Sequence, residues 1–454
     1  MNEVIVSKFG GTSVQDANAI RNVCSIVSNR NEKTFIVVSA LSKVTDTLIS
    51  LIEKIKNKEI EEANRIVEVI FERHFKIASE LEIARETEEY FKQKQEELNV
   101  FSTALGILGE VTNRSVDYIL SFGELLSSFL VFVYLRSRGL DIAYIDPRNI
   151  IKTDSNYTCA EVDFNSTKKA LLKELSKFST QSYWITGGFV GSDSFSNTTT
   201  LGRGGSDYSA SVIASIVGAK VLEIWTDVDG ILTADPKIVM NAKLLKEVSY
   251  DEASELAIFG AKVLHPKTIF PAVAKKIPVY VLNTFNPSSK GTLISHRSSK
   301  RKVVKGIAYR KNVTVINIKS NRMLGAYGYL AKVFDIFNKF QTSVDLVSTS
   351  EVSISLTIDD PKNLDKILFE LSKISNVEVF DNCCIVSIIG EGLKDSTTIA
   401  SRIFNVLKNT KILMVSMGSS DINFSFVVRG EDLEKTVVLL HKEFFENLNG
   451  NDIL

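Results

Sequence analysis

The chain has 454 residues, with 54 lysines and arginines against 54 aspartates and glutamates, so its formal net charge is zero. At this length we expect two or three domains of roughly 100–200 residues and a large buried core. The balanced charge argues against a nucleic-acid-binding protein that depends on overall positive charge. Any site for an anion must therefore be local.

Cysteine and histidine spacing gives no indication of a metal site. The four cysteines show no CxxC pattern, and we expect reduced thiols, with Cys383 and Cys384 packed in a strand. Glu3 and Lys8 interrupt the first apolar residues, so no signal peptide is expected. The longest apolar stretch, at 129–135, is too short to span a membrane. We therefore expect a cytoplasmic protein that binds neither membranes nor nucleic acids.

The first 295 residues alternate strand-like and helix-like segments, which is typical of an α/β domain with a mainly parallel sheet. A helix is expected over 13–29, where Ser13 and Asp16 have the spacing of a capping box. The region 44–138 is predicted to be mostly helical, with a solvated and partly charge-rich layer. Strands are expected at 4–9, 34–40, 141–146, 183–190, 221–227 and 277–283.

An internal repeat follows a short basic linker at 296–303. Residues 311–381 have the order β-α-β-β-α-β, and 382–454 repeat that order without the last strand. The segment "VKGIAYR" at 304–310 would supply the missing strand. The economical arrangement inserts the first α+β, ferredoxin-like unit (311–381) into the second (304–310 plus 382–454), after a catalytic domain over 1–295.

Lys8, Gly10 and Gly11 lie between the first expected strand and the first expected helix. Glycines let a ligand approach the backbone, and N–H groups at the start of a helix attract anions. The loop is therefore a candidate phosphate site, although an ordinary tight turn would have the same composition. No GxxxxGK[ST] motif occurs, so this is not a Walker-type loop.

A second glycine-rich loop, "TLGRGGSDYSA" at 200–210, opens another expected helix. Arg203 offers a planar fork for a carboxylate or a phosphate. Asp207 would repel a phosphate, so we expect it to pair with a lysine or to help hold a metal–nucleotide complex. Two such loops in one α/β domain favour an anion site over two ordinary turns.

Three further motifs place charged residues where a site would need them. "WTDVDG" ends an expected strand, where open α/β sheets bind ligands, so Asp227 either caps a turn or faces a nucleotide. Lys262, in "FGAKVLHP", would be a second cation for a phosphoryl group. Glu124, in "SFGE", interrupts an apolar run and either meets a buried cation, such as a substrate ammonium, or lies at a surface edge.

Together with "KFGGTSV" at 8–14, these motifs occur in the order in which they occur in the aspartate kinases, which the chain resembles over essentially its whole length. The C-terminal repeat resembles the paired ACT domains of that family. "SVDLVSTSEVSISLTID" at 343–359 is similar to the first ACT domain of the lysine-sensitive, single-function class. The length of the chain leaves no room for the homoserine dehydrogenase of the bifunctional class.

The resemblance implies transfer of the γ-phosphoryl group of ATP, with Mg²⁺, to the β-carboxylate of L-aspartate, the first step toward lysine, threonine and methionine. A carboxylate nucleophile is already ionised at neutral pH, so no general base is required. The resemblance assigns catalysis to Lys8, Asp207 and Lys262. It assigns ATP binding to Lys8, Gly10, Gly11, Thr226, Asp227, Lys237 and Lys262. It assigns aspartate binding to Ser39, Thr45, Glu124, Arg203, Gly204 and Ser206, with Arg203 on the α-carboxylate and Glu124 on the ammonium.

The resemblance also implies inhibition by L-lysine, whose ammonium would pair with Asp345 in the first ACT domain. The residues expected around this effector are Met323, Tyr329, Leu330, Ser343 and Val344. A homodimer through the edge strands of the ACT domains is the expected assembly. The sequence departs from the family pattern at Leu232, Lys237, Gly325 and Ala326, so nucleotide and effector affinities are expected to differ from those of relatives.

Two other functions fit parts of the sequence. Another enzyme of the amino-acid-kinase fold would phosphorylate glutamate, a nucleotide or carbamate, but that class lacks the paired ACT tail and "KFGGTSV". A non-catalytic ACT sensor of amino acids would have lost its kinase residues, whereas this sequence retains Lys8, Glu124, Arg203, Asp207 and Lys262.

Overall fold

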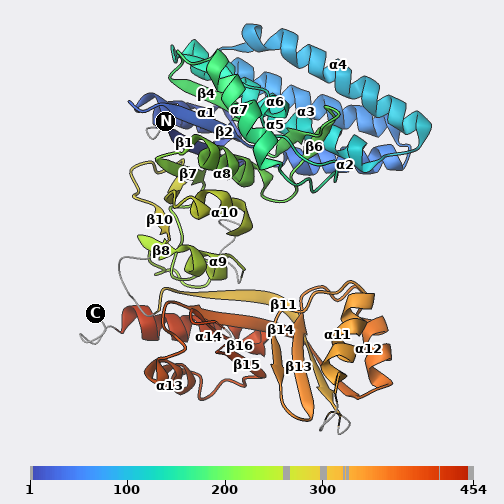
Figure 1. Cartoon of the computed structure of the whole chain (residues 1–454), viewed down its shortest axis with the longest axis vertical. Helices are drawn as coiled ribbons and strands as arrows, with labels where there is room; N and C mark the ends of the chain where they lie inside the picture. Colours follow the sequence, from blue (N-terminus) through green and yellow to red (C-terminus); the bar gives the residue numbers. More distant parts are fainter. Residues whose placement is uncertain are drawn as a thin grey trace. The chain divides into compact units, whose positions relative to one another are not determined.

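The computed structural model describes residues 4–258, 266–296, 304–320, 323, 327–418 and 420–447. The chain forms two compact units, of which Figure 1 shows the elements. Unit 1 comprises Met1–Ile231, Lys246–Tyr250 and Val263–Arg297, and unit 2 comprises Leu232–Leu245, Asp251–Lys262 and Ser298–Leu454. Two segments of the first 295 residues thus belong to unit 2. The compact units do not coincide with the expected domain limits, and the division 1–295, 296–303 and 304–454 stays a prediction.

Unit 1 is built on an eight-stranded sheet with the order β3-β4-β2-β1-β7-β9-β10-β8. Strands β1, β2, β4 and β7 are parallel to their neighbours, and β10 runs antiparallel to β9. The mainly parallel α/β sheet predicted from the alternation of strands and helices is confirmed. The strands are β1 (Ile5–Phe9), β2 (Thr34–Val38), β3 (Ile142–Tyr144), β4 (Tyr183–Gly187), β7 (Val221–Thr226), β8 (Glu247–Ser249), β9 (Val279–Asn283) and β10 (Thr292–Ser295). A separate two-stranded ribbon consists of β5 (Val190–Ser192) and β6 (Thr198–Thr200).

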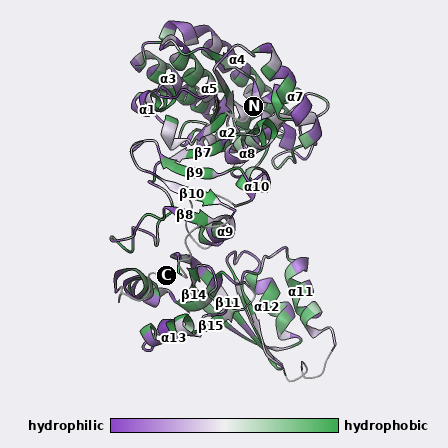
Figure 2. Ribbon diagram, turned by 60° about the vertical axis from the view of Figure 1, so that its left-hand side comes forward, coloured by the Kyte–Doolittle hydropathy of each residue, from purple (hydrophilic) through white to green (hydrophobic). Residues whose placement is uncertain are grey.

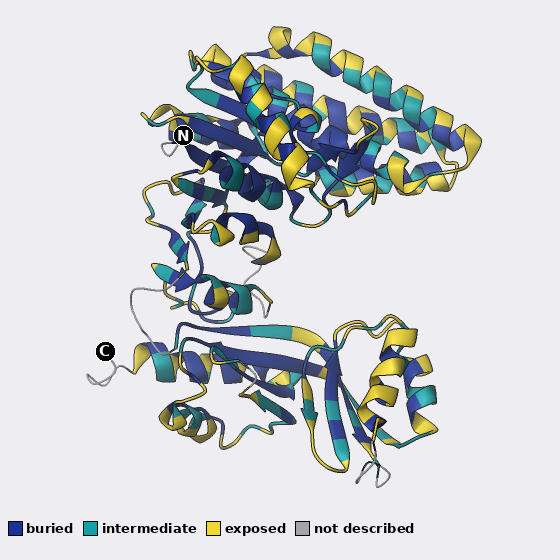
Figure 3. Ribbon diagram, in the orientation of Figure 1, coloured by how far each residue is buried: buried dark blue, intermediate teal, exposed yellow. Residues whose placement is uncertain are grey.

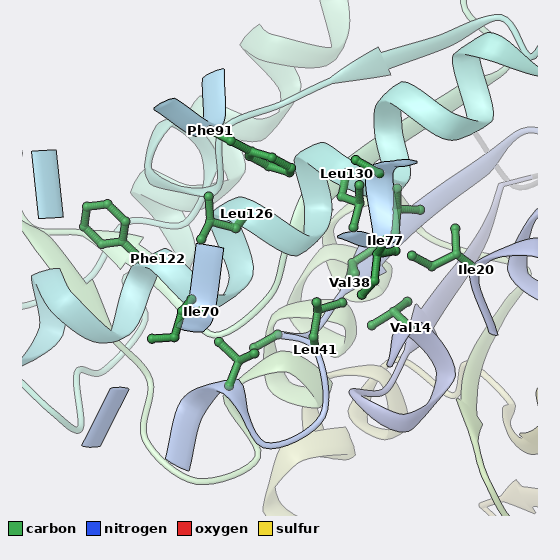
Figure 4. Close-up of a cluster of buried hydrophobic side chains, with 14 of the residues drawn as sticks. Val14, Ile20, Val38, Leu41, Ile70, Ile77, Phe91, Phe122, Leu126 and Leu130 are labelled. Carbon is green, nitrogen blue, oxygen red and sulfur yellow. The ribbon is translucent and has the colours of Figure 1, made fainter. Parts of the chain in front are cut away.

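A helical layer covers the sheet, and its buried face forms the main hydrophobic core (Figure 3). In Figure 4, Val38 of β2 lies beside Ile77 of the helical layer, and Phe91, Leu126 and Leu130 belong to the same cluster. Each such buried side chain stabilises the fold by roughly 1.5–3 kcal/mol. The helices of unit 1 are α1 (Ala17–Ser28), α2 (Val44–Lys56), α3 (Ile60–Glu80), α4 (Ala84–Leu108), α5 (Asn113–Ser137), α6 (Pro147–Ile150), α7 (Phe164–Lys177), α8 (Gly205–Val217) and α10 (Pro266–Ala274). Helix α9 (Tyr250–Ile258) belongs to unit 2 except for its first residue.

The capping box predicted for the first helix is wrong. A 3₁₀ turn, η1 (Thr12–Val14), precedes α1, and the N-cap of α1 is Asp16, whose side chain accepts a hydrogen bond from Ala19 N. Ser13 instead lies in the turn, where its hydroxyl donates to Trp225 O at 3.2 Å and accepts from Thr284 Oγ1. The role of Ser13 is therefore decided by contacts with β7 and with the segment after β9. Such contacts between distant parts of the chain cannot be predicted from the spacing of neighbouring residues.

Helix α5 is the one helix within the described residues whose length and composition would let it cross a membrane. The uninterrupted apolar stretch at 129–135 is short, but the helix around it has 25 residues. Of its most apolar window, 83% is buried inside the protein, which fits a core helix.

Unit 2 contains a six-stranded antiparallel sheet with the order β12-β13-β11-β14-β16-β15. Its helices carry apolar faces toward two separate cores and polar faces outward (Figure 2). The strands are β11 (Gly306–Lys319), β12 (Val347–Thr349), β13 (Ser353–Ile358), β14 (Asn376–Ile389), β15 (Met414–Met417) and β16 (Asn423–Arg429). The helices are α11 (Tyr329–Lys339), α12 (Leu364–Ser372), α13 (Thr397–Val406) and α14 (Leu433–His441).

Two pairs of strands that were expected to be separate are continuous in unit 2. The segment 304–310 joins the next expected strand in β11, and the strands expected around 377–381 and 383–390 join in β14. Asn312 and Asn382 have positive φ angles of 59° and 52° where the pairing shifts register. Asparagine tolerates this conformation, so each strand passes the irregularity without ending.

Candidate active site

The register of the parallel strands brings four loops to one edge of the sheet. Phe9, the last residue of β1, pairs with Val38 of β2 and with Trp225 of β7, and Val38 pairs with Gly187 of β4. The loops that follow these strands therefore begin at the same level. Because the strand order runs from β1 to both sides, this edge is the topological switch point, where open α/β sheets bind ligands.

An ion pair between Lys8 and Asp207 joins two of the predicted motifs. Lys8 Nζ lies 2.6 Å from Asp207 Oδ1, and the two side chains are only 12% and 14% exposed. Lys8 comes from β1, and Asp207 comes from the first turn of α8. A Cβ atom placed on Gly10 would lie 3.6 Å from Lys8 Nζ, so the ammonium stands beside the first glycine loop. Of the two partners expected for Asp207, the structure shows a lysine.

Close approaches of backbone explain two glycines at this edge. A Cβ atom on Gly11 would lie 2.9 Å from Ala40 O, in the loop after β2. A Cβ atom on Gly188 would lie 2.6 Å from both Cα and Cβ of Ser206, at the start of α8. A side chain at either position would push the loops apart. Gly188 was not among the predicted site residues, although the pair of glycines at the end of β4 was a signal for it.

Glu124 is buried, so of the two positions expected for it, the one at the surface edge of the helix is excluded. It is 4% exposed, and its Oε1 accepts a hydrogen bond from Ala40 N at 3.2 Å, while Oε2 is buried without a partner. Burial raises the pKa of Glu124 to about 8, against the opposing effects of Ala40 N–H, the Lys8 charge and the Ser206 hydroxyl. A buried carboxylate oxygen without a donor suits a cationic ligand group, because binding one would satisfy the oxygen and its charge.

The second glycine loop presents Arg203 to solvent at the start of α8. Gly202 and Gly204 have positive φ angles of 71° and 75°, which a side chain would strain. Gly204 is the N-cap of α8 and no side chain caps the helix. Apart from Gly205 N–H, which donates to Gly202 O, the N–H groups of the first turn are therefore available to an anion. Arg203 is exposed and has no hydrogen bond or ion pair with any other described residue. Its guanidinium is therefore free to bind a ligand.

The other predicted residues of unit 1 follow the ends of β2 and β7. Ser39 follows β2, where its N–H donates to Phe9 O and its carbonyl oxygen accepts from Ser127 Oγ at 2.7 Å. Thr45 is half-buried in the first turn of α2, the next helix. Thr226 Oγ1 donates to the exposed Asp227 at 3.1 Å after β7.

Two predicted lysines are not in unit 1. Lys237 belongs to unit 2, where its backbone N–H donates to Asp235 Oδ1. Lys262 lies outside the described residues. In unit 1 the structure thus brings together Lys8, both glycine loops, Glu124 and Asp207.

Comparison with protein families identifies the class of enzyme. Residues 3–283 match the model of the amino acid kinase family, and residues 386–444 match an ACT domain. The fold and the site therefore define an ATP-dependent phosphotransferase of the amino acid kinase family with a C-terminal ACT region.

Individual relatives narrow this class. Over 454 residues the chain is 36% identical to lysine-sensitive aspartokinase 3 of Escherichia coli (strain K12), covering 98% of this chain and 100% of that protein. It is 38% identical to chloroplastic aspartokinase 1 of Arabidopsis thaliana, covering 99% of this chain and 81% of that one. The crystal structure of E. coli aspartokinase III in complex with aspartate and ADP matches with a TM-score of 0.83 at 36% identity, over 98% of this chain and 100% of that one. The aspartate kinase of Clostridium acetobutylicum matches with a TM-score of 0.81 at 30% identity, again over 98% and 100%. The chain belongs to the aspartokinases.

Burial of Glu124 should make the stability of the protein depend on pH. The folded protein keeps the Glu124 proton until its pKa of about 8, whereas the unfolded chain releases it near 4.5. The stabilisation is therefore complete below pH 4.5 and is lost as the pH rises through 8. Between pH 6 and pH 8.5 we expect the native protein to lose about 2–3 kcal/mol of unfolding free energy relative to Glu124→Gln. Urea unfolding followed by circular dichroism measures this difference, and parallel pH profiles for the two proteins would contradict it.

Proposed function

We propose that phosphoryl transfer takes place beside the Lys8–Asp207 pair, at the carboxyl edge of β1. The observation that carries this proposal is the 2.6 Å contact of these side chains between two glycine loops. The Lys8 ammonium neutralises charge on the transferring γ-phosphoryl group of ATP, and Asp207 holds the ammonium in place. The Gly10 and Gly11 loop provides the close backbone approach that phosphate oxygens require.

The same site receives L-aspartate with its β-carboxylate directed at the phosphoryl group. The free Arg203 guanidinium binds the α-carboxylate, and Glu124 binds the α-ammonium through its unpartnered buried oxygen. Ser39, Thr45, Gly204 and Ser206 line this side of the site. Support comes from the E. coli relative, whose structure is described as a complex with aspartate and ADP.

ATP binds with Mg²⁺ as one substrate. Within the described residues there is no group of three or more histidine, cysteine, aspartate or glutamate side chains that could hold a metal ion. The magnesium therefore enters on the nucleotide phosphates, with Asp207 as the protein carboxylate of the site. Thr226 and Asp227, at the end of β7, contact the nucleotide. The assignments of Lys237 to the nucleotide and of Lys262 as a second cation stay predictions from the family resemblance.

Chemistry at this site depends on position and charge. The β-carboxylate of aspartate is ionised at neutral pH and attacks without a general base. Glu124 must be deprotonated to pair with the ammonium, so substrate binding lowers the pKa that burial raises. A hydroxamate assay with ATP and aspartate tests the activity, and absence of aspartyl hydroxamate with formation from another amino acid would contradict the substrate.

L-Lysine is the proposed inhibitor, with its side-chain ammonium on Asp345 of unit 2. Asp345 Oδ1 lies 2.6 Å from Arg310 Nη1, while Oδ2 is buried without a partner. Burial raises the pKa of Asp345, although Arg310 opposes this effect. Arg310 also contacts Asp359 at 3.2 Å and donates to Ile258 O at the end of α9. An ammonium on Asp345 would compete with Arg310 for the carboxylate and so alter the hold of Arg310 on α9.

Of the other expected effector residues, Tyr329 and Leu330 begin α11, Met323 precedes it, and Ser343 and Val344 follow its end. Met323 and Val344 pack partly against the core of this half of unit 2, and Leu330 and Ser343 are exposed. Tyr329 is buried and its hydroxyl donates to Ile374 O at 3.3 Å, so it joins the start of α11 to the segment after α12. The E. coli relative supports this assignment, since it is named lysine-sensitive and one of its structures is described as a complex with lysine.

A homodimer through the ACT units, at 311–381 and at 304–310 plus 382–454, is also part of the proposal. Strands β12 and β15 end the strand order of the sheet and each pairs with one neighbour in it. A second chain could add a strand at such an edge. We place the enzyme in the cytoplasm, because its four cysteines are free, which suits a reducing compartment.

Replacement of Lys8 tests the catalytic centre. Lys8→Ala should lower kcat by at least about a hundredfold, because it removes a main electrostatic stabiliser of the transition state. Lys33→Ala is the control, since Lys33 is an exposed lysine at the opposite edge of the sheet, before β2. Steady-state kinetics of both folded variants decide the matter. A near-normal kcat for Lys8→Ala would remove Lys8 from this role.

Replacement of Arg203 tests substrate recognition. Arg203→Ala should raise KM for aspartate far more than KM for ATP, because only the α-carboxylate loses its partner. Arg65→Ala, at an arginine that is 69% exposed on α3, should change neither value. If KM for ATP rises and KM for aspartate does not, the loop binds the nucleotide and the assignment is reversed.

Replacement of Asp345 tests regulation. Activity is measured against added lysine, threonine and methionine, and lysine alone should inhibit. A coupling of about 1–3 kcal/mol between effector and substrate sites is typical and would give clear inhibition. Asp345→Ala should lose this sensitivity and keep most of its uninhibited kcat. Asp359→Ala, which removes the other carboxylate beside Arg310, should remain sensitive. Inhibition by threonine but not lysine, or full sensitivity of Asp345→Ala, would contradict the assignment.

A further inference from the structure

A second buried carboxylate, Asp117, lies on α5 two helical turns before Glu124. The spacing of seven residues places both side chains on nearly the same face of the helix, about 10 Å apart along its axis. Asp117 is 0% exposed, and no lysine or arginine nitrogen among the described residues lies within 4.0 Å of it. The mechanism described above does not use this group.

Four hydrogen bonds from neutral donors satisfy Asp117. Thr158 N–H donates to both carboxylate oxygens at 3.0 Å, Thr200 N–H donates at 2.9 Å and Thr200 Oγ1 donates at 2.6 Å. A buried carboxylate is costly, so its retention requires donors that stay in place. Asp117 therefore fastens two loops, the one around 158 and the one that leaves β6, to the helix that carries Glu124.

These two loops are also hydrogen-bonded to each other next to the second glycine loop. Ala160 N donates to Thr200 O at 2.9 Å. Thr158 has a φ of 74°, which is rare for threonine, and its carbonyl oxygen would lie 3.3 Å from a Cβ atom on Gly202. The backbone of Thr158 therefore packs against Gly202 through its carbonyl oxygen, and the N–H of Thr158 is bound by Asp117.

Arg203 is three residues after Thr200 and directly follows Gly202. Its side chain has no partner among the described residues, so the direction of its guanidinium depends on its backbone. On one side, Gly205 N donates to Gly202 O and begins α8, and on the other side, Thr200 is bound to Asp117. The backbone of Arg203 is therefore held between α8 and Asp117.

We propose that Asp117 is a positioning residue that fixes the Arg203 loop relative to Glu124, and so sets the affinity for the α-amino acid end of the acceptor substrate. The proposal rests on the assignment of Arg203 to the α-carboxylate. Helix α5 then carries two residues that determine recognition of the substrate. Glu124 binds the α-ammonium directly, and Asp117 positions Arg203, which binds the α-carboxylate.

The chain offers a matched control at the far end of the β5–β6 ribbon. Asp193 is also a buried carboxylate, 3% exposed, and it accepts hydrogen bonds from Ser155, Tyr157, Phe195 and Asn197. Because Ser192 pairs with Thr198 and Val190 pairs with Thr200, Asp193 lies at the opposite end of the ribbon from Asp117. Replacing Asp193 should weaken the turn of the ribbon and the side-chain bonds of Ser155 and Tyr157, while the Thr158 and Thr200 donors stay on Asp117.

The experiment measures KM for aspartate and for ATP in the full-length enzyme. Asp117→Asn puts an amide donor where Thr158 and Thr200 present donors, and KM for aspartate should rise at least about tenfold. KM for ATP should stay within about twofold of the native value. Thr200→Val removes only the hydroxyl bond and should give a smaller rise of the same kind. Asp193→Asn should lower the thermal midpoint and leave both KM values unchanged.

Double variants show whether Asp117 acts through Arg203. In an Arg203→Ala background, Asp117→Asn or Thr200→Val should change KM for aspartate by less than about twofold, because the group that they position is gone. A rise as large as in the native background, an equal rise in Asp193→Asn, or an unchanged KM in both folded Asp117→Asn and Thr200→Val would overturn the proposal. If Asp117→Asn does not fold, the Thr200→Val cycle decides. If Arg203→Ala alone leaves KM for aspartate unchanged, the assignment of Arg203 fails and this proposal fails with it. If Arg203→Ala raises KM and the other variants do not, only this proposal fails.

Discussion

Parallel pairing of β1 with β2 and β7 is the constraint on which the candidate site depends. Hydrogen bonds along these strands bring Phe9, Val38 and Trp225 to one level, so the loops after them open at one edge. The chain changes direction across the sheet at β1, which leaves space outside its end. Lys8 is one residue before this end and can therefore meet Asp207, which is some two hundred positions later in the sequence.

The site concentrates charge in a poorly solvated place. Lys8 and Asp207 offset each other, Asp117 is held by neutral donors, and Glu124 keeps one oxygen without any donor. Such groups destabilise the folded state unless they are paired, and functional sites commonly accept this cost. The raised pKa of Glu124 is the consequence of burying a carboxylate that has no cationic partner.

Unit 2 couples its two halves through continuous strands. β11 and β14 run through both hydrophobic cores, and the two asparagines with positive φ angles allow the change of register between them. Arg310 lies on β11 beside this irregularity and binds both Asp345 and the end of α9. Arg310 therefore connects Asp345, the proposed effector residue, to the end of α9.

The sequence by itself determined the alternating α/β organisation, the terminal repeat and most of the candidate site, because these depend on local features. Glycines beside Lys8 and Arg203, or a glutamate within an apolar helix, carry their chemistry at short spacing. Only the tertiary structure decided that Ser13 binds β7 and does not cap α1, and that β11 is one strand. It also decided which lysine meets Asp207, and that Gly188 and Asp117 hold the loops around Arg203. These features arise from contacts between residues that are far apart in the chain, and the spacing of residues along the sequence does not determine which distant residues come together in the folded protein.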